Sequence, residues 1–326
     1  MNNDNLPLDL ALMDPELREL LIPIKAQLQA IGIDGFNTES IALMRQLMNM
    51  RGEDLPQGEP RVEKRFIAGI DGAPDVAVYV IGAQAGAAKP AILHMHGGGY
   101  VIGNAVSALP RFQQLARDNN CVIVSVEYRL APETPFPGAL DDNYSALKWL
   151  HDNAETLGVD RARISVMGES AGGGHAAMLA IAARDRGEVS IHHQILIYPM
   201  LDDRTGNLKP NKPWVGQHIW TASDNYFGWS ALLGVAAGSP SVPAGSVPAR
   251  VENLSGLPTT FIAVGSLDLF VNESIEYARR LLDAGVPTDL CVMAGAFHGF
   301  DGLAPTAAIS QRFTAAVDAA VRRACV

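Results

Sequence analysis

Short apolar runs rich in β-branched residues alternate with helical patterns from about Pro60 onward. The runs expected to form strands are residues 76–82, 91–97, 121–128, 164–170, 192–200, 259–268 and 288–295. Apolar positions at helical spacing lie between them, near 107–118, 138–157, 171–186, 272–284 and 304–323, with Gly285 as a cap beyond a helix end. This alternation is typical of a parallel sheet covered by helices on both faces, so the pattern predicts an α/β fold.

Two regions depart from that alternation. The first reads as amphipathic helices around residues 10–21 and 39–50, and the second is irregular and rich in aromatic side chains. Insertions over an α/β core usually lie at its active edge. We therefore expect N-terminal cap helices (1–50), a catalytic core (51–202 and 251–326) and a cap insertion (203–250). Whether the aromatic residues of the insertion line a pocket or only pack together stays open at this stage.

The composition permits one large core and limits the partners. Of 326 residues, 48% are hydrophobic and 18% are charged, so the chain can bury a sizeable interior. The formal net charge of −10 opposes binding to nucleic acid or to an anionic membrane surface, and a small molecule is the expected partner. Three scattered cysteines are too few for a disulfide framework or a CxxC zinc site. We expect no metal and no cofactor.

The beginning of the chain bears on its location. Its first twenty residues carry acids where a signal peptide has a basic region, and they lack an uninterrupted apolar stretch. No apolar run in the sequence approaches the length of a membrane span. We therefore expect a cytoplasmic protein without stable membrane association, and the choice between monomer and homodimer stays open.

The clearest chemical motif is GESAG at residues 168–172, between the apolar run ISVM and a helix-competent run. In a strand-to-helix turn this tight, the central Ser170 takes a strained backbone conformation, and only glycines two positions on either side avoid clashes. The turn lifts the hydroxyl above the sheet, where the following helix presents free N–H groups to negative charge. GxSxG can arise by chance in a chain with 31 glycines, but the flanking strand and helix favour Ser170 as a nucleophile.

A second glycine motif, HGGGY at residues 96–100, follows the apolar run AILHM. Three successive glycines let the backbone approach a ligand and direct N–H groups into a shared space. We expect the N–H groups of Gly98, Gly99 and Ala171 to hold the oxyanion of a tetrahedral intermediate, as a glycine run of this kind does in lipases and esterases. A phosphate loop is disfavoured, because a Walker lysine is absent and no GxGxxG opens a helix here. His96 lies on the strand side of the glycines and is expected to brace the loop.

An activated serine needs an imidazole as general base and a carboxylate that orients it. Among the histidines that follow Ser170, His298 comes just after a late strand, at the carboxyl end where open α/β sheets bind ligands. Asp268 ends the preceding strand, and the chain between it and His298 accommodates one helix, a turn and one strand. Glu273 competes as the acid, but it falls in the first turn of a helix, where the dipole already explains it. The sequence predicts a triad of Ser170, His298 and Asp268, with Glu273 supporting.

Several motifs occur in one order along the chain: HGGGY (96–100), YRLAPETPFPGALDD (128–142), GESAGGG (168–174), Asp268 with Glu273, and HGF (298–300). In this combination the sequence resembles the hormone-sensitive lipase family of esterases, also called bacterial family IV, over nearly its whole length. The resemblance implies an α/β-hydrolase fold with a mostly parallel eight-stranded sheet, flanking helices, and a mobile helical cap built from the N-terminal segment and an insertion after the sixth strand. It also implies the same triad and oxyanion donors, and activity on short-chain acyl esters.

Two departures from the family pattern affect neighbours of the reacting groups. The common GDSAG form has aspartate where this chain has Glu169, and the common DPL tripeptide is here Asp268, Leu269 and Phe270. The change at Glu169 affects the hydrogen bonds near the serine, and Glu169 is expected to support the serine turn. The change after Asp268 affects the turn that carries the acid. Neither removes a reacting group.

The sequence therefore predicts a serine carboxylesterase that hydrolyses short- to medium-chain acyl esters through an acyl-enzyme intermediate. Lipase, amidase and lactonase activities remain alternatives, because the same triad serves every acyl transfer. A non-catalytic small-molecule receptor on this fold is a further alternative, and the retained His298 argues against it. The residues expected to line the substrate pocket are Tyr100, Trp214, Trp220 and Phe300.

Overall fold

The computed structural model of the protein describes residues 6–30, 35–49 and 55–326. Within these residues, eight strands form one sheet in the spatial order β1-β2-β4-β3-β5-β6-β7-β8. The strands are β1 (Val62–Ile67), β2 (Val76–Ile81), β3 (Lys89–Met95), β4 (Val122–Glu127), β5 (Val159–Glu169), β6 (His193–Ile197), β7 (Thr259–Gly265) and β8 (Thr288–Met293). β2 pairs antiparallel with β1 and with β4, and all other neighbours pair in parallel. The prediction of a mostly parallel eight-stranded sheet is confirmed.

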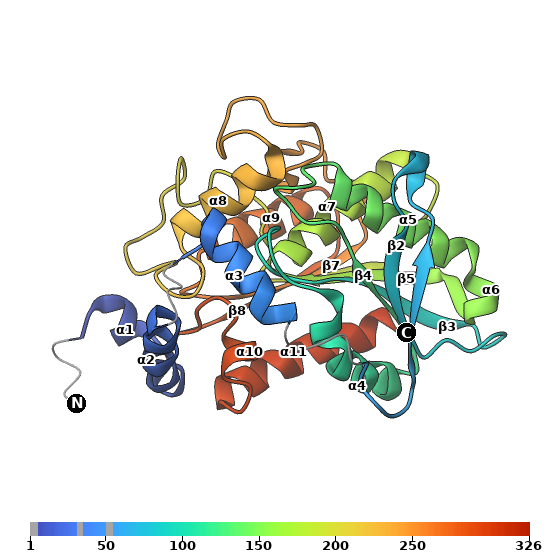
Figure 1. The fold of residues 1–326 in the computed structure, drawn as a ribbon, viewed down its shortest axis with the longest axis horizontal. Helices are drawn as coiled ribbons and strands as arrows, with labels where there is room; N and C mark the ends of the chain where they lie inside the picture. The colour runs from blue at the N-terminus through green and yellow to red at the C-terminus, as the bar shows by residue number, and fades with distance from the viewer. Residues whose placement is uncertain (1–5, 31–34, 50–54) are drawn as a thin grey trace.

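Helices cover both faces of the sheet (Figure 1). One layer holds α5 (Gly138–Asp152), α7 (Ala171–Arg186) and α9 (Val271–Asp283), and the other holds α4 (Leu109–Asn119), α10 (Phe300–Leu303) and α11 (Ala308–Ala324). The remaining helices are α1 (Leu8–Leu12), α2 (Pro15–Ala30), α3 (Thr38–Asn49), α6 (Ala154–Leu157), α8 (Ala222–Leu233) and the 3₁₀ helices Ile70–Gly72, Ala105–Ala108 and Pro248–Arg250. No helix of the described residues is both long and apolar enough to span a membrane.

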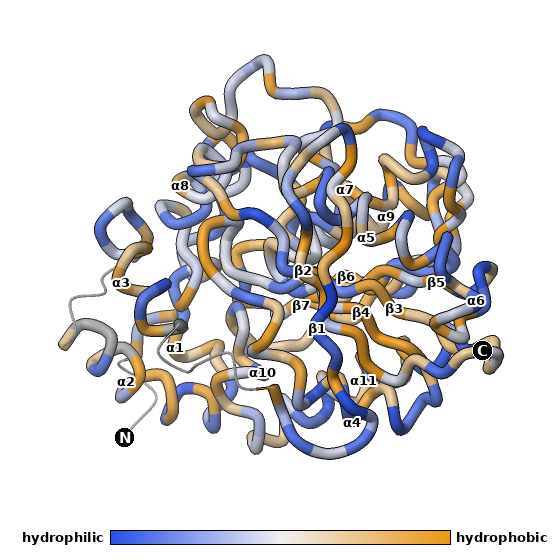
Figure 2. Tube along the Cα trace, turned by 45° about the vertical axis from the view of Figure 1, so that its right-hand side comes forward, coloured by the Kyte–Doolittle hydropathy of each residue, from blue (hydrophilic) through white to orange (hydrophobic). Residues whose placement is uncertain are grey.

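Alternating side chains of the strands build a hydrophobic core on each face of the sheet. In β3, Leu93 and Met95 belong to the core on the α5 and α7 side, whereas Ile92 belongs to the core on the α4 and α11 side. Successive residues of a strand point to opposite faces, so a continuous apolar run such as AILHM serves both cores. Figure 2 shows hydrophobic colour over much of the central strands β3 and β4.

Two expectations about elements need correction. The apolar pattern does not predict β1, because this edge strand carries Glu63, Lys64 and Arg65 and leaves Phe66 68% exposed. An edge strand with few buried side chains has no apolar run by which to recognise it. The helix expected around residues 10–21 is interrupted, since Met13 is extended at the end of α1 and Pro15 begins α2.

The two segments expected to form a cap contact each other. Ile41 of α3 shares a small hydrophobic cluster with Phe227 and Ala231 of α8, and Figure 1 shows the two helices on the same side of the molecule. The cluster also contains Val101, which follows the HGGGY motif. The expected boundary between residues 50 and 51 lies outside the described residues. These contacts bring the N-terminal segment and the insertion to the glycine loop at the edge of the sheet.

Candidate active site

Ser170 occupies the sharp turn between β5 and α7. Its backbone angles, φ 57° and ψ −119°, fall in a region that non-glycine residues rarely adopt. A Cβ added at Gly168 would overlap the carbonyl oxygen of Gly172, and a Cβ added at Gly172 would overlap the carbonyl oxygen of Met95. The backbone segments around the serine are therefore packed too closely for any side chain at these two positions, which is the clash that the GESAG pattern predicts.

One chain of hydrogen bonds joins Ser170, His298 and Asp268. The Oγ of Ser170 lies 2.9 Å from Nε2 of His298, and Nδ1 of His298 lies 2.8 Å from Oδ2 of Asp268. The second carboxylate oxygen accepts the N–H of Phe270 at 2.9 Å. Asp268 follows β7 and His298 follows β8, so the ends of adjacent parallel strands bring the two side chains together. With its Nδ1 proton bonded to the carboxylate, the imidazole has Nε2 free to accept the serine proton.

Two aromatic rings fix the orientation of the His298 imidazole. Tyr198 and Phe270 contact it edge to face, with ring centroids 4.8 Å and 5.1 Å away. The hydroxyl of Tyr198 donates to Oδ1 of Asp301 at 3.1 Å. Burial raises the pKa of Tyr198 well above its ordinary value, and burial also raises the pKa of Asp301. Tyr198 therefore stays a neutral donor, and its hydrogen bond to Asp301 holds the ring against the imidazole.

The HGGGY loop lies beside the serine turn. A Cβ added at Gly97 would stand 3.5 Å from the Cβ of Ser170, so the two loops are in direct contact. Gly98, Gly99 and Tyr100 all have positive φ, at 129°, 60° and 70°. Ala171 begins α7, and N–H groups in the first turn of a helix have no partner within that helix. The three N–H groups expected to hold an oxyanion thus belong to adjoining backbone segments next to Ser170.

His96 was expected to brace the glycine loop, and it contacts the first glycine of that loop. Its ring stacks on Tyr128 with centroids 4.1 Å apart, and its Nδ1 lies 2.8 Å from the carbonyl oxygen of Gly97. The Tyr128 hydroxyl donates to the His96 carbonyl oxygen at 2.6 Å. Burial lowers the pKa of His96 to about 3, so its ring is neutral near pH 7. These contacts support a structural role for His96.

Glu169 ties the serine turn to the neighbouring strands. Its carboxylate lies 2.8 Å from Nε2 of His94 on β3, and Nδ1 of His94 lies 2.9 Å from the hydroxyl of Ser125 on β4. His94 is fully buried. The residue that replaces the aspartate of the common motif therefore reaches a histidine that the motif does not contain.

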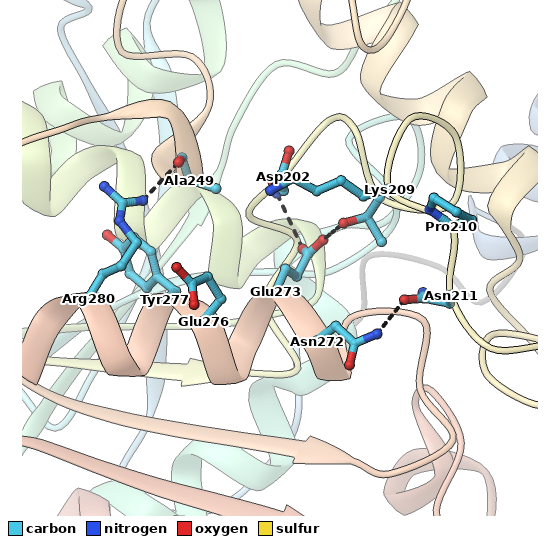
Figure 3. Close-up of a pocket in the computed structure, with 11 residues that line it drawn as sticks. Asp202, Lys209, Pro210, Asn211, Ala249, Asn272, Glu273, Glu276, Tyr277 and Arg280 are labelled. Carbon is cyan, nitrogen blue, oxygen red and sulfur yellow. Dashed lines mark hydrogen bonds and ion pairs between the residues drawn. The ribbon is translucent and has the colours of Figure 1, made fainter.

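Glu273 does not hydrogen-bond to His298, and it anchors the start of the insertion. Its carboxylate accepts the N–H of Leu201 at 2.7 Å, the N–H of Asp202 at 3.3 Å and the hydroxyl of Thr205. Burial raises the pKa of Glu273 well above its ordinary value. Figure 3 shows this carboxylate in the wall of a cavity of about 400 Å³, which Lys209, Asn211, Asn272, Glu276, Tyr277 and Arg280 also line.

The four residues expected in the substrate pocket divide into two groups. Trp220 lies over Gly99, where its ring tip would overlap an added Cβ, and its ring centroid is 6.4 Å from that of His298. Trp214 is half-buried and packs against the core on the α4 and α11 side. Tyr100 and Phe300 need correction, because they are only 1% and 0% exposed and therefore line no open space. The Tyr100 hydroxyl donates to the carbonyl of Met200, and Phe300 packs on Phe313 in the core.

Sequence reasoning missed three residues around the site: Tyr198, which contacts His298, Asp301, which accepts from Tyr198, and His94, which contacts Glu169. Positional signals exist for all three. His94 lies near the end of a strand, Tyr198 directly follows β6, and Asp301 directly follows HGF. Polar residues at the carboxyl ends of parallel strands are candidates for a site whether or not a motif contains them.

Comparisons with known proteins agree with this geometry. A family model described as an alpha/beta hydrolase fold matches residues 92–302. Esterase LipI of Mycobacterium tuberculosis is 35% identical over 67% of this chain and 68% of its own length, and carboxylesterase NlhH of the same species is 32% identical over 96% of both chains. The solved structure of a bacterial heroin esterase superposes with a TM-score of 0.86 at 35% identity, covering 97% of this chain and 98% of that one.

Proposed function

Because this chain belongs to the α/β-hydrolase family and is a carboxylic ester hydrolase, we propose that it hydrolyses short- to medium-chain acyl esters through an acyl-enzyme on Ser170. The observation that carries the proposal is the hydrogen-bonded chain of Ser170, His298 and Asp268 next to the glycine loop. A small-molecule ester is the only partner that the proposal includes. The N-terminal helices and residues 203–250 form the cap over the substrate.

In the acylation step, Oγ of Ser170 attacks the carbonyl carbon of the ester while Nε2 of His298 accepts its proton. The former carbonyl oxygen becomes an oxyanion, which accepts hydrogen bonds from the N–H groups of Gly98, Gly99 and Ala171. As the tetrahedral intermediate collapses, the bond to the alcohol oxygen breaks, and the imidazolium gives its proton to that oxygen. The alcohol leaves, and the acyl group stays on Ser170.

In the deacylation step, a water molecule attacks the acyl carbon and His298 accepts one of its protons. A second oxyanion forms in the same hydrogen-bonding site, and its collapse breaks the bond to Oγ while the proton returns to Ser170. Asp268 holds the imidazole in one tautomer and stabilises the imidazolium that forms in both steps. The products are one carboxylic acid and one alcohol for each water consumed.

The acyl length follows from the wall that Trp220 builds beside the triad. Its ring packs edge to face against Phe36 with centroids 4.8 Å apart, so the N-terminal segment supports the indole from behind. The N–H of Phe36 donates to Asp224, whose carboxylate also caps α8. Each added methylene of the acyl chain contributes about 0.8 kcal/mol of binding until the chain meets this wall, after which overpacking opposes it. Short to medium chains are therefore favoured.

A series of p-nitrophenyl esters from acetate to laurate, assayed below their solubility limits, tests the proposal together with Ser170→Ala. We expect kcat/KM to peak at a few acyl carbons and then fall. Ser170→Ala should lower kcat by at least about a thousandfold at an unchanged melting temperature, because the covalent step is lost while the fold remains. A variant that keeps more than about a hundredth of wild-type kcat would remove Ser170 from the mechanism. Highest activity on laurate, with a further rise at an oil–water interface, would identify a lipase instead.

A further inference from the structure

The glycine loop has positive φ at three consecutive residues, a conformation that glycine adopts readily and tyrosine does not. Gly98, Gly99 and Tyr100 all have positive φ, and Tyr100 has a side chain that disfavours such angles. Within the loop, the carbonyl oxygen of Gly98 accepts the N–H groups of Val101 and Ile102. A strained, glycine-rich segment keeps one shape only where its surroundings enforce it. The contacts that surround the loop therefore matter for the direction of its N–H groups.

One of these contacts comes from Arg45 on α3. Its Nε donates to the carbonyl oxygen of Val101 at 2.7 Å, and its Nη2 donates to the carbonyl oxygen of Ala131 at 2.8 Å. The N–H of Ala131 in turn donates to the carbonyl oxygen of Tyr100 at 3.0 Å. One planar guanidinium thus joins the end of the glycine loop to the segment that begins YRLAPE.

Packing and charge hold the guanidinium in this place. Ile41, one turn before Arg45 on α3, packs with Val101 and Ala131, and all three are at most 4% exposed. Glu133 accepts hydrogen bonds from Nη1 and Nη2 of Arg45 at 2.8 Å and 3.1 Å. The Glu133 side chain is 63% exposed and that of Arg45 is 25% exposed, so their ion pair is partly screened by solvent. The hydrogen bonds to the two carbonyl groups are the ones that fix the loop.

We propose that Arg45 is a positioning residue for the oxyanion-binding loop. By fixing the carbonyl of Val101, two residues after Gly99, it directs the N–H groups of Gly98 and Gly99 toward the place where the oxyanion forms. Helix α3 then contributes to stabilising the transition state without contacting the reacting atoms. This inference rests on the proposed ester hydrolysis at Ser170.

The effect expected from Arg45 is on kcat. The N–H groups act on the oxyanion, which exists in the transition state and the intermediate, so their misplacement leaves substrate binding little changed. Loss of one such donor typically costs 10²–10³-fold in kcat, and a displacement of about 1 Å can cost 10²-fold. We therefore expect Arg45→Ala to lower kcat about 10- to 100-fold with KM within about twofold of wild type.

The experiment compares Arg45→Ala, Arg45→Lys and Glu133→Ala, each with melting temperature and active-site concentration measured. The readouts are kcat and KM on p-nitrophenyl butyrate, and the inhibition constant of a trifluoromethyl ketone with a similar alkyl chain, which adds to Ser170 and forms an oxyanion. Arg45→Ala should raise the inhibition constant of the ketone by about the same factor by which it lowers kcat. Arg45→Lys should recover part of the loss in kcat and part of the loss in ketone binding. Glu133→Ala should keep kcat and the inhibition constant within about threefold of wild type, because Arg45 still donates to the two carbonyl groups.

Three results would overturn the inference. The first is a lower melting temperature for Arg45→Ala with kcat unchanged in the folded enzyme, since that describes a purely structural contact. The second is a raised KM with kcat unchanged, which would place α3 in substrate binding. The third applies if Arg45→Ala does not fold: Arg45→Met then replaces it, because methionine keeps an unbranched apolar stem without a donor, and wild-type kcat and ketone binding in Arg45→Met would overturn the inference. Activity retained by Ser170→Ala would refute the proposed function itself, whereas an inactive Ser170→Ala beside unaffected Arg45 variants refutes this inference alone.

Discussion

The serine turn at residues 168–172 and the glycine loop at residues 97–100 adjoin each other, yet different parts of the molecule confine them. In the serine turn, a Cβ at Gly172 would overlap the backbone carbonyl of Met95 on β3. In the glycine loop, a Cβ at Gly99 would overlap the indole of Trp220, which belongs to the insertion. The backbone of neighbouring strands therefore fixes the proposed nucleophile, whereas side chains of residues 203–250 help to confine the proposed oxyanion donors.

This difference separates two ways of changing activity. A change in residues 203–250 can alter the position of Gly99 while the serine turn keeps its geometry, because Gly228 of α8 also packs directly against the carbonyl oxygen of Gly99. The turn itself depends on β3, β5 and α7, which form the centre of the fold. Substitutions in the two loops should differ in size of effect and in whether a second substitution can compensate.

The largest effect should come from Gly172→Ala. Alanine favours a helix over glycine by about 1 kcal/mol, so helix propensity alone predicts a gain in stability here. The overlap with the Met95 carbonyl should reverse that gain, lower the melting temperature and reduce kcat at least about a thousandfold, because the serine turn must shift. Gly302→Ala is the matched control, since an added Cβ there meets nothing within 4 Å. Wild-type kcat in Gly172→Ala would show that the turn tolerates displacement.

A smaller and partly reversible effect should come from Gly99→Ala. Its Cβ meets the tip of the Trp220 ring, and alanine at φ 60° is strained by roughly 1–2 kcal/mol. We expect kcat to fall about 100-fold, as for loss of one oxyanion donor. Gly99→Ala combined with Trp220→Leu should recover part of this loss, because the second change removes the obstacle and leaves the backbone strain. The kcat of the double variant, compared with both single variants, measures the coupling.

If the double variant is no more active than Gly99→Ala, Trp220 does not confine the loop, and the contrast between the two loops disappears. Trp220→Leu alone supplies the necessary baseline, since it removes the wall beside His298 without adding an atom to the loop. That single variant should also accept longer acyl chains than wild type, which separates its effect on the pocket from its effect on the loop.

The sequence was sufficient to predict the parts of the site that depend on local backbone geometry. GESAG requires glycine at position 168 because of the turn itself, since a Cβ there would overlap the carbonyl oxygen of Gly172, and the spacing from Asp268 to His298 follows from one βαβ unit. Such constraints act within a few residues or within one repeating unit of the fold. A pattern along the chain records them directly.

The parts that could not be predicted depend on contacts between segments far apart in the sequence. Arg45 lies 56 residues from Val101, and Phe36 donates to Asp224 across 188 residues. An arginine on an amphipathic helix is ordinarily read as part of a solvated face, and nothing nearby in the sequence marks its carbonyl partners. Tyr100 shows the opposite error, because it was expected to line the substrate pocket although its side chain is buried in the core.

The smallest effect should come from the root of the insertion, which must be held in place for Trp220 to lie over Gly99. Burial raises the pKa of Glu273 above its ordinary value of 4.5, so the folded state favours the protonated acid. The stability linked to that proton is fully present below the ordinary pKa and is lost as the pH rises through the raised pKa. Glu273→Gln removes this titration, so the melting temperature of the variant relative to wild type should increase as the pH rises above 4.5.

Glu276→Gln is the control, because Glu276 lies on the same helix but its pKa is lowered by Arg279, and this variant should show no such increase. Both variants should keep kcat within about twofold, because neither residue belongs to the proposed triad or oxyanion site. The melting temperature of Glu273→Gln relative to wild type could instead stay constant or fall as the pH rises. That result would mean that the N–H groups of Leu201 and Asp202 hold an ionised carboxylate at the start of residues 203–250.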